Sequence, residues 1–449
     1  MKRIFYLILS CFLYSSIIAQ NSVLDQYIEI GIESNLVLKQ KELASKEAII
    51  KLKEARGLFL PQVSLNARYT MSRGGRSFNL PLGDMMNPVY RTLNGLTSSD
   101  FPMMNNQMFY FQPDEEQETK MEVVQPVFNR AIHLNKQMQK EGVGMSQAEL
   151  KRYKETLIFQ IKESYYNVLK AEKILQLIQA TKELVNENLR VSQKLFEHDM
   201  VTKENVLRSR TEVNKVALNE TEAVKSKELA VGYINFLLNR PLDEPVEVLA
   251  DLHFIPTVNQ EQLTVRALTN RSELRLMDHQ INSLELLAKT NRAANMPNLT
   301  LTANYGFLGE EYKFDSDHDH FTASLVLNWT LFKGRVNKHK RQQSLIQKQK
   351  AQLAKDDLSN GIRLEVKESW LELQRQYINI DVTETRSTEA AEVYKIMEKK
   401  YRLGESSLIE LMDARTNMTE AEFSYIISRF DYLVSIAKLE YTTASSLIQ

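Results

Sequence analysis

The sequence predicts a mainly α-helical chain with two long helical hairpins and four β-strands, and three observations carry this prediction. All ten prolines fall at or before Pro297, and none lies between Pro126 and Pro241. Two stretches of the chain therefore lack the residue that most often breaks a helix. Apolar residues in those stretches follow helical spacing, whereas short segments elsewhere alternate between apolar and polar residues. An internal repeat relates the two halves of the chain.

The predicted helices are long, and one of them has two apolar seams. Residues 133–195 would extend ~95 Å as a single helix at ~1.5 Å per residue. Ile178 and Val185 mark a second seam beside the first, which indicates two helical neighbours. An ordinary extended coiled coil, which needs only one seam, is the alternative. The first seam contains Leu177, Thr181, Leu184, Asn188, Val191 and Leu195, and the spacing recurs in Phe423, Ile427, Phe430, Val434, Ala437 and Tyr441.

An offset of 205 residues relates the two predicted hairpins. They turn near residues 198–201 and 403–406, and Gly404 suits a helix end that needs a positive φ. Asp199 occupies the corresponding place in the first half. The first repeat spans about residues 20–240 and the second about 257–449. The offset maps Lys162-Glu163-Ser164 onto Lys367-Glu368-Ser369, Lys194 onto Lys399, Phe196 onto Tyr401, and Arg210-Thr211 onto Arg415-Thr416.

Three segments between the helical blocks have the period of a strand with one apolar and one polar face. A fourth, residues 118–128, is less regular and is interpreted as a strand because its end, Gln125-Pro126-Val127-Phe128, is the counterpart of Trp329-Thr330-Leu331-Phe332. In the first segment Val63, Leu65, Ala67 and Tyr69 alternate with polar residues. The loop between the first two strands is longer than its counterpart in the second half, which indicates an insertion at a hairpin tip. The predicted strands are 62–71, 118–128, 298–308 and 321–332, and the loops between them are 72–119 and 309–320.

Strands of this length and pattern fit a tilted crossing of an outer membrane. Bacterial barrels, however, need about eight or more strands to close. Open edges in lipid would leave backbone donors and acceptors unpaired at several kcal/mol each, so closure by several copies is the physical solution. The alternative is a small soluble sheet that caps a coiled coil.

The N-terminus predicts export. Lys2 and Arg3 precede an apolar run from Ile4 to Leu13, and Ala19 suits a cleavage site, so residues 1–19 are interpreted as a signal peptide. A membrane anchor is the alternative, but the run is shorter than the ~20 apolar residues that span a bilayer. Lipidation at Cys11 is a minor alternative, because the apolar region before it is short.

Composition narrows the class of partner. The chain contains 57 lysines and arginines and 57 aspartates and glutamates. It therefore lacks the excess of basic residues that is expected of a nucleic-acid-binding protein. Cys11 is the only cysteine, so the mature chain would contain neither disulfides nor thiolate metal sites. Burial and assembly must therefore supply its stability.

An ordered set of motifs resembles the TolC-type outer-membrane efflux proteins over nearly the whole mature length. Each motif alone is weak, but their duplicated order is specific. The motifs are an alanine-rich helix running into Leu60-Pro61-Gln62-Val63-Ser64-Leu65, the strand end Pro126-Val127-Phe128, Tyr166 with Leu169, Ala171 and Glu172, and the turn-and-helix element Tyr401, Leu403-Gly404, Leu408 and Glu410-Leu411-Met412-Asp413-Ala414.

The resemblance implies a homotrimer in the outer membrane. Each protomer would give four strands to a 12-stranded β-barrel and its duplicated long hairpins to a periplasmic α-barrel. The trimer would be a passive duct of an efflux or type I secretion system, docked by a periplasmic adaptor (membrane fusion protein) and an inner-membrane pump. Two rival interpretations are a periplasmic adaptor, which would have one hairpin flanked by compact β domains, and an extended coiled-coil structural protein of the envelope.

The resemblance also places candidate functional residues at the hairpin tips. Glu410 and Asp413 match a pair of acids that narrows the periplasmic entrance in the family, and their spacing of three puts them on one helical face. Helix-start acids that favour the helix dipole are the alternative. Asn205 and Arg208 hold the corresponding places in the first half, so only the second half would supply acids. The predicted adaptor-docking residues are Asp199, Met200, Val201, Leu403, Gly404, Glu405 and Ser406.

Two other groups of residues suggest metal binding but have simpler explanations. The first is a polar cluster that fits a solvated loop, and the second is a methionine-rich loop that fits packing at a barrel mouth. No catalytic motif or phosphate-binding loop is recognisable, so the sequence predicts no enzyme, cofactor or metal site. The two groups are Asp315, Asp317, His318, Asp319 and His320, and Met85, Met86, Met103, Met104 and Met108.

Overall fold

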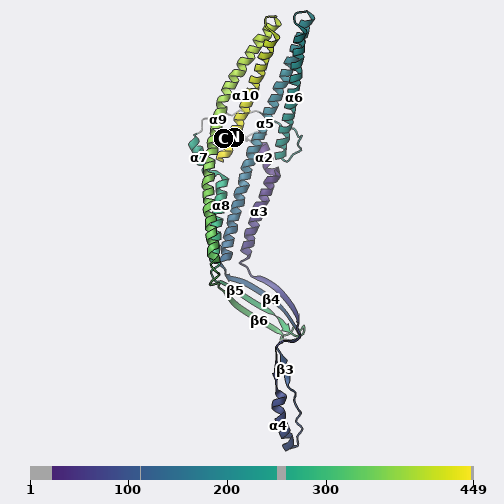
Figure 1. The fold of residues 1–449 in the computed structure, drawn as a ribbon, viewed down its shortest axis with the longest axis vertical. Helices are drawn as coiled ribbons and strands as arrows, with labels where there is room; N and C mark the ends of the chain where they lie inside the picture. Colours follow the sequence, from purple (N-terminus) through teal and green to yellow (C-terminus); the bar gives the residue numbers. More distant parts are fainter. Residues whose placement is uncertain (1–22, 112, 250–258, 446–449) are drawn as a thin grey trace, which may run out of the picture. The chain divides into compact units, whose positions relative to one another are not determined.

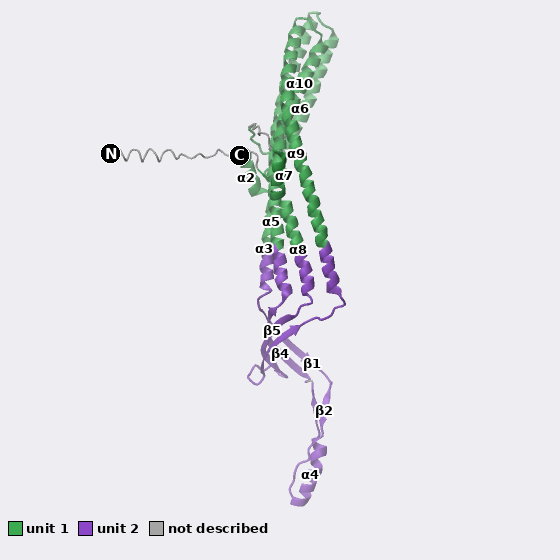
Figure 2. Ribbon diagram, turned by 90° about the vertical axis from the view of Figure 1, so that its left-hand side faces the viewer, with its two compact units in different colours: residues 1–49, 141–283, 347–449 green, residues 50–140, 284–346 purple. Residues whose placement is uncertain are grey.

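The computed structural model describes residues 23–111, 113–249 and 259–445. The predicted signal peptide, including Cys11, lies outside these residues. The chain divides into two compact units, which Figure 2 colours separately. Among the described residues, the helical unit contains those up to 49, those within 141–283 and those from 347 onward, and the strand-bearing unit contains those within 50–140 and 284–346. No helix in the described part of the chain is both long and apolar enough to cross a bilayer.

Two long helical hairpins dominate the fold (Figure 1). The first pairs α5 (Arg130–Glu197) with α6 (Lys203–Leu237), and the second pairs α9 (Val336–Arg402) with α10 (Leu408–Thr443). The 68 residues of α5 and the 67 of α9 each form one helix, as the proline-free stretches predicted. The duplicated hairpins are therefore confirmed.

A broken helix precedes each half of the sheet. Asn35 separates α2 (Val23–Ser34) from α3 (Leu36–Gly57), and Arg271 separates α7 (Gln260–Asn270) from α8 (Ser272–Ala293).

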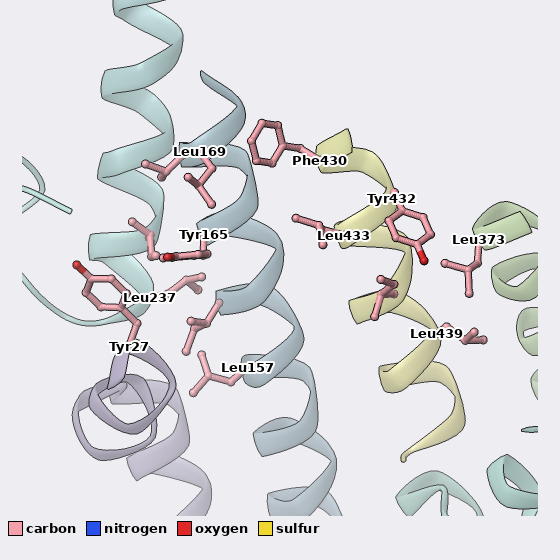
Figure 3. Close-up of a cluster of buried hydrophobic side chains, with 14 of the residues drawn as sticks. Tyr27, Leu157, Tyr165, Leu169, Leu237, Leu373, Phe430, Tyr432, Leu433 and Leu439 are labelled. Carbon is pink, nitrogen blue, oxygen red and sulfur yellow. The ribbon is translucent and has the colours of Figure 1, made fainter. Parts of the chain in front are cut away.

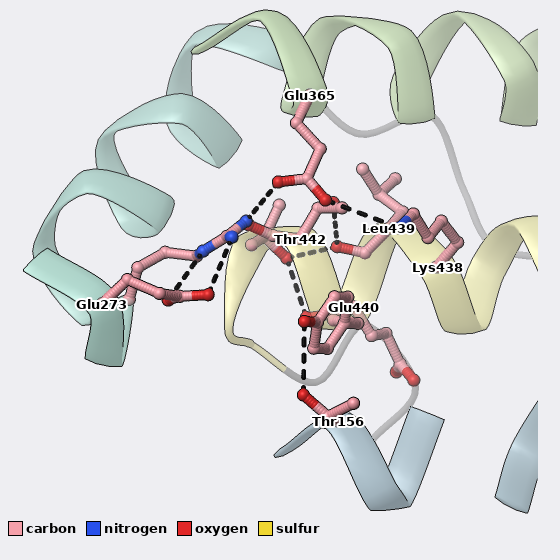
Figure 4. A network of polar contacts seen from close by, with 10 residues as sticks. Thr156, Glu273, Glu365, Lys438, Leu439, Glu440 and Thr442 are labelled. Carbon is pink, nitrogen blue, oxygen red and sulfur yellow. Dashed lines mark hydrogen bonds and ion pairs between the residues drawn. The ribbon is translucent and has the colours of Figure 1, made fainter. Parts of the chain in front are cut away.

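The two breaks cap the ends of the hairpins in the same way. The Asn35 amide donates to the Leu237 carbonyl at 2.9 Å, and the Arg271 guanidinium donates to the Thr442 carbonyl at 3.2 Å. Figure 4 shows the polar network around Thr442, which includes Glu273 and Glu365. The repeat therefore extends to the contacts between helices.

Helix α5 packs against a different helix on each side. Its Tyr165 ring lies 6.1 Å from the Tyr27 ring of α2, and its Phe159 ring lies 5.2 Å from the Tyr441 ring of α10. Figure 3 shows side chains from these helices meeting in the main apolar cluster. Two helical neighbours are what the two seams predicted. Where the same spacing recurs on α10, Phe423 is 39% exposed, whereas other members such as Phe430 are buried.

The four long strands form one antiparallel sheet in the order β1-β4-β5-β6. Their bounds are β1 (Gln62–Met71), β4 (Glu115–Phe128), β5 (Asn298–Gly309) and β6 (Asp319–Asn328). The alternating pattern predicted β6 to continue to residue 332, which is wrong. Asn328 pairs with Asn298, the first residue of β5, so no partner remains beyond it. The Trp329 indole instead donates to the Asn295 carbonyl at 3.0 Å.

The pairing register gives the sheet one apolar and one polar face. Leu65, Met121, Tyr305 and Phe321 lie opposite one another across all four strands and are 72%, 51%, 49% and 69% exposed. This row defines the apolar face. On the polar face, cross-strand and neighbouring side chains form ion pairs, among them Arg68 with Glu116 at 3.3 Å and Lys120 with Glu118 at 2.6 Å.

The insertion between β1 and β4 is structured, whereas the sequence predicted a loop. We call residues 72–114 the arm; it contains β2 (Ser77–Leu80), α4 (Leu82–Thr97) and β3 (Gln107–Tyr110). Pro88 lies inside α4, which concealed the helix in the sequence.

Side-chain bonds that the sequence does not reveal hold the arm together. The side chain of Asn87 exchanges two hydrogen bonds with the backbone of Met104, and that of Asn94 exchanges two with the backbone of Phe101. The two asparagines thereby tie α4 to the returning chain.

Candidate functional site

The tips of the two hairpins turn with the same backbone geometry. The amides of Asp199 and Met200 donate to the carbonyls of Phe196 and Leu195 at 3.0 and 2.8 Å. In the second tip the amides of Gly404 and Glu405 donate to Tyr401 and Lys400 at 3.0 and 2.9 Å. Both turns are Schellman motifs, which need a left-handed residue after the helix end. Asp199 and Gly404 provide it, with φ of 57° and 76°.

The helices that follow the turns begin differently. Thr202, the N-cap of α6, makes no side-chain capping bond. Ser407, the N-cap of α10, forms a capping box with Glu410. The Glu410 amide donates to the Ser407 hydroxyl at 3.3 Å, and the Glu410 carboxylate accepts from the Ser407 amide at 2.8 Å. Only the second turn therefore has side-chain capping at the start of the following helix in addition to the Schellman motif at the end of the preceding one.

The same box sets the ionisation of Glu410. The hydrogen bond from the Ser407 backbone, followed by those from the hydroxyls of Ser407 and Ser406, lowers the pKa of this carboxyl. Glu410 is exposed, and its charge is held against the helix N-terminus, where the helix dipole also favours an anion.

Asp413 lies one turn beyond Glu410 and is also exposed. Its carboxylate accepts a 3.3 Å bond from the amide of Asn417. In the first tip the corresponding Arg208 forms an ion pair with Glu204 at 2.7 Å. The two tips thus present opposite charge at the equivalent position.

A groove of about 290 Å³ lies between the two tips. It brings together four of the predicted docking residues, whereas Asp199, Leu403 and Glu405 lie outside its lining. Met200 and Leu403 are 65% and 63% exposed, so each tip carries a large apolar side chain at its surface. The groove is lined by Met200, Val201, Gly404 and Ser406, together with Leu195, Glu204, Asn205, Arg208, Tyr401, Ser407, Leu408 and Ile409.

Polar contacts below the groove join the hairpins, and sequence reasoning did not find them. The hydroxyl of Tyr401 lies 3.1 Å from that of Ser192, which lies 3.0 Å from that of Ser209. Arg415 of α10, whose side chain is 5% exposed, forms an ion pair with Glu212 of α6. The repeated Arg-Thr pair was the available signal, but it could not reveal that the second copy is buried.

The two groups that suggested metal binding belong to the strand-bearing unit. His318 pairs with Asp315 through Nδ1 and Oδ1 at 2.5 Å. Among the residues that the structure describes, no three His, Cys, Asp or Glu side chains gather in a way that could hold a metal ion.

Comparison with known proteins points to one family. Residues 263–441 match the family model described as outer membrane efflux protein. The chain is 22% identical over 440 residues to the outer membrane protein TolC of Escherichia coli (strain K12), covering 94% of this chain and 82% of that protein. It is 21% identical over 303 residues to the alkaline protease secretion protein AprF of Pseudomonas aeruginosa, covering 66% and 63%.

Solved structures share the fold. The Campylobacter jejuni CmeC outer membrane channel superposes with a TM-score of 0.78 at 15% identity, over 94% of this chain and 85% of that one. The outer membrane protein VceC of Vibrio cholerae gives 0.77 at 14% identity, over 96% and 98%.

Proposed function

This chain belongs to the outer membrane efflux protein family, and we propose that it is the outer-membrane duct of a tripartite efflux or type I secretion system. In this proposal three copies form one conduit, and substrates pass through it without chemical change. Energy comes from an inner-membrane pump, and a periplasmic adaptor connects the pump to the hairpin tips. The chain itself catalyses nothing and carries no cofactor.

The observation that carries the proposal is the apolar row across all four strands of a sheet with open edges. Within the described residues, no strand pairs with the outer edge of β1 or of β6. Exposed apolar side chains suit lipid, but unpaired edge groups do not. Three copies would bring the number of strands to twelve, above the roughly eight that a membrane barrel needs. The polar face would then line the lumen.

The tips support a docking role for the periplasmic end. The groove between them is lined from both hairpins, and the exposed Met200 and Leu403 offer apolar contacts at its border. Apolar side chains beside charged ones are typical of a surface that a partner protein covers. We assign the adaptor-docking surface to both turns, residues 199–201 and 403–406.

We further assign the periplasmic gate to Asp413 and Glu410. Threefold symmetry would place six carboxylates around the entrance, which would favour cations over anions. Asp413 has the larger part in this selectivity, because the capping box already holds Glu410 against the start of α10. Mutual repulsion among the Asp413 carboxylates would favour opening.

The duct is tested by fractionating the cell envelope, extracting the protein in mild detergent, and measuring its mass and its single-channel conductance. We expect an outer-membrane trimer that conducts. A monomer found in the soluble fraction, without conductance in planar bilayers, would overturn the proposal.

The gate is tested separately with the variants Asp413→Ala and Glu410→Ala. Asp413→Ala should lower conductance and weaken cation preference, because it removes both the repulsion that favours opening and the carboxylates that attract cations. Glu410→Ala should have the same effects to a smaller degree. Glu405→Ala is the matched control, because it removes an exposed acid from the same tip without touching the proposed ring. If all three variants had the same conductance and the same cation preference, the two acids would act only as charges that stabilise the start of the helix.

A further inference from the structure

One end of the four-stranded sheet carries a concentration of positive charge. At this end β1 and β5 begin, β4 and β6 end, and the helices α3, α5, α8 and α9 meet the strands (Figure 2). Residues 50–61, 126–140, 284–297 and 329–346 together contain 13 lysines and arginines but only two acids, Glu54 and Glu285. We call these 13 bases the basic collar. All of them belong to the strand-bearing unit, in a chain whose formal net charge is zero.

Contacts among the four helix ends bring the basic collar together. The ring of Phe59, just beyond α3, lies 4.8 Å from the ring of His133 on α5. A small apolar cluster joins α5 to α8. The side chain of Asn291 on α8 donates to the hydroxyl of Ser344 on α9 at 2.9 Å. The bases of the four segments therefore surround the same end of the sheet.

The start of α9 is the densest part of the basic collar. No acid occurs between Lys333 and Lys355. The bases that begin this segment are exposed, and within the described part of the chain none of them forms an ion pair. Their charge is thus available to an anion outside the chain. These bases are Lys333, Arg335, Lys338, Lys340 and Arg341.

The stability of the helices does not explain these charges. The N-terminus of a helix is the positive end of its dipole, where acids stabilise and bases destabilise. Both α5 and α9 begin at the basic collar, and neither has an acid in its first turn. In contrast, α10 begins with Glu410 in its capping box. The bases at the start of α9 also repel one another, which indicates that an anionic partner offsets their cost.

Large apolar side chains lie beside the basic collar. Leu331 and Phe332, directly before Lys333, are 78% and 79% exposed, and Leu60 and Trp329 are exposed as well. We call these four residues the apolar rim. Exposed aromatic and aliphatic side chains next to lysines and arginines are typical of the interface of a membrane, where the bases extend to the headgroups. A soluble polyanion would need only the bases.

The opposite end of the sheet has the reverse charge. Residues 310–319, which connect β5 to β6, contain five acids and one base, Lys313. Positive charge is therefore not a general property of the sheet ends. It is confined to the end at which the helices begin and end.

We propose that the basic collar binds the phosphate groups of anionic phospholipids in the periplasmic leaflet of the outer membrane, while the apolar rim contacts their acyl chains. This inference rests on the proposed function, which places the sheet in that membrane. Each base close to an anionic membrane surface strengthens binding about fivefold. The collar thereby holds the helix end of the sheet at the level of the lipid phosphates.

Lipid binding to the detergent-extracted protein tests the collar. The protein is titrated with a fluorescent phosphatidylglycerol and, separately, with a phosphatidylcholine of the same chain length. The triple variant Lys338→Gln, Lys340→Gln, Arg341→Gln, here called the collar variant, should weaken phosphatidylglycerol binding by on the order of 100-fold. Its binding of phosphatidylcholine, which has no net charge, should stay unchanged. Added salt should weaken only the binding of phosphatidylglycerol.

A second triple variant is the matched control. Lys395→Gln, Lys399→Gln and Lys400→Gln remove the same charge from the other end of α9, so this variant should bind phosphatidylglycerol like the parent. Equal affinity of the parent for the two lipids would overturn the inference, and so would collar-dependent binding of a soluble anionic glycan without selectivity for phosphatidylglycerol. A conducting trimer whose collar variant binds phosphatidylglycerol like the parent would overturn this inference and leave the proposed function intact. A soluble monomer without conductance would overturn both.

Trp329 reports where the lipid binds. Its indole is held beside the basic collar by the bond to the Asn295 carbonyl, and Trp370→Phe leaves it as the only tryptophan of the chain. This variant is reconstituted in phosphatidylcholine with a minor fraction of phosphatidylglycerol, and the acyl chains of one lipid at a time are brominated. Brominated phosphatidylglycerol should quench Trp329 more than its share of the bilayer predicts, and the collar variant should lose this excess. Quenching in proportion to the share would contradict the proposed binding.

Discussion

Asp199 and Gly404 occupy the same left-handed position in two Schellman motifs that lie 205 residues apart. An aspartate tolerates this conformation less well than a glycine, because its Cβ approaches the following carbonyl. The turn is nevertheless preserved, since the hydrogen bonds at the helix end require a residue with positive φ. Geometry has been kept at this position even though the residue type has changed.

Substitutions at these two positions should have opposite effects. Gly404→Ala should destabilise the second tip by about 1 kcal/mol, because alanine, unlike glycine, is strained in the left-handed backbone conformation. Apart from the atoms of the neighbouring residues in the chain, nothing lies within 4 Å of a Cβ built there, so this cost is confined to the local backbone. Asp199→Gly should stabilise the first tip by a few tenths of a kcal/mol, at about the lower end of the glycine effect. Hydrogen exchange of the tip peptides measures both changes.

The start of α10 should weaken in acid. The capping box lowers the pKa of Glu410 in the folded protein, so its stabilisation is present above the usual carboxyl pKa. It should be lost as the pH falls through the lowered value. Hydrogen exchange of residues 403–412, corrected for the intrinsic rate, should increase below about pH 4. The variant Glu410→Gln should lack this pH dependence, and Glu405→Ala should keep it.

Arg415→Ala should be far more harmful than Arg210→Ala. The Arg415 side chain is 5% exposed, and its loss would leave Glu212, which is 18% exposed, without its partner. Removing one member of such a pair should cost about 2–3 kcal/mol, whereas the exposed Arg210 should cost about 0.5 kcal/mol or less. Thermal denaturation in detergent compares the two variants. Similar destabilisation by both would mean that Arg415 does not join the hairpins.

Arg271 should tolerate neither alanine nor lysine. Its guanidinium contacts Glu273, Glu365 and the Thr442 carbonyl at once, and a single ammonium cannot reproduce this forked geometry. Arg271→Lys should cost about 2 kcal/mol and Arg271→Ala about 3 kcal/mol. Asn35→Ala is the matched change in the first repeat, and it should cost about 1 kcal/mol, because a neutral amide is lost. The midpoints of thermal denaturation should follow this order.

The arm should loosen without affecting the rest of the protein. The double variant Asn87→Ala with Asn94→Ala removes four hydrogen bonds between α4 and the returning chain. Limited proteolysis should then cut the arm faster, while the thermal midpoint stays unchanged. Thr92→Ala is the control, because its hydroxyl bonds only within α4. A lower midpoint in the double variant would mean that the arm contributes to the stability of the sheet.

The sequence predicted the hairpins and, at the strand ends next to the helices, three of the four bounds, residues 62, 128 and 298, because these features depend on local patterns. Proline-free stretches, seams three and four apart and alternation of period two report directly on helix and strand. The same patterns gave wrong predictions where contacts with a distant part of the chain determine the secondary structure. Trp329 and Leu331 alternate like a strand, but β5 offers no residue opposite them. The helix of the arm was missed because Pro88 indicates a loop, while Asn87 and Asn94 hold the helix through contacts with distant backbone.

By itself, the sequence determined the long hairpins, the presence of the four long strands, their duplication and the positions of the two tips, since backbone propensity and hydrophobic period are properties of neighbouring residues. Only the tertiary structure showed whether two residues at matching places in the repeat have the same burial and the same partners. Arg415 and Arg210 occupy matching places in the repeat, yet the first is buried against Glu212 and the second is exposed. Likewise Glu410 is tied into a capping box, while Asn205 at the matching place is not. Burial and pairing depend on what lies across the fold, and a linear pattern carries no record of that.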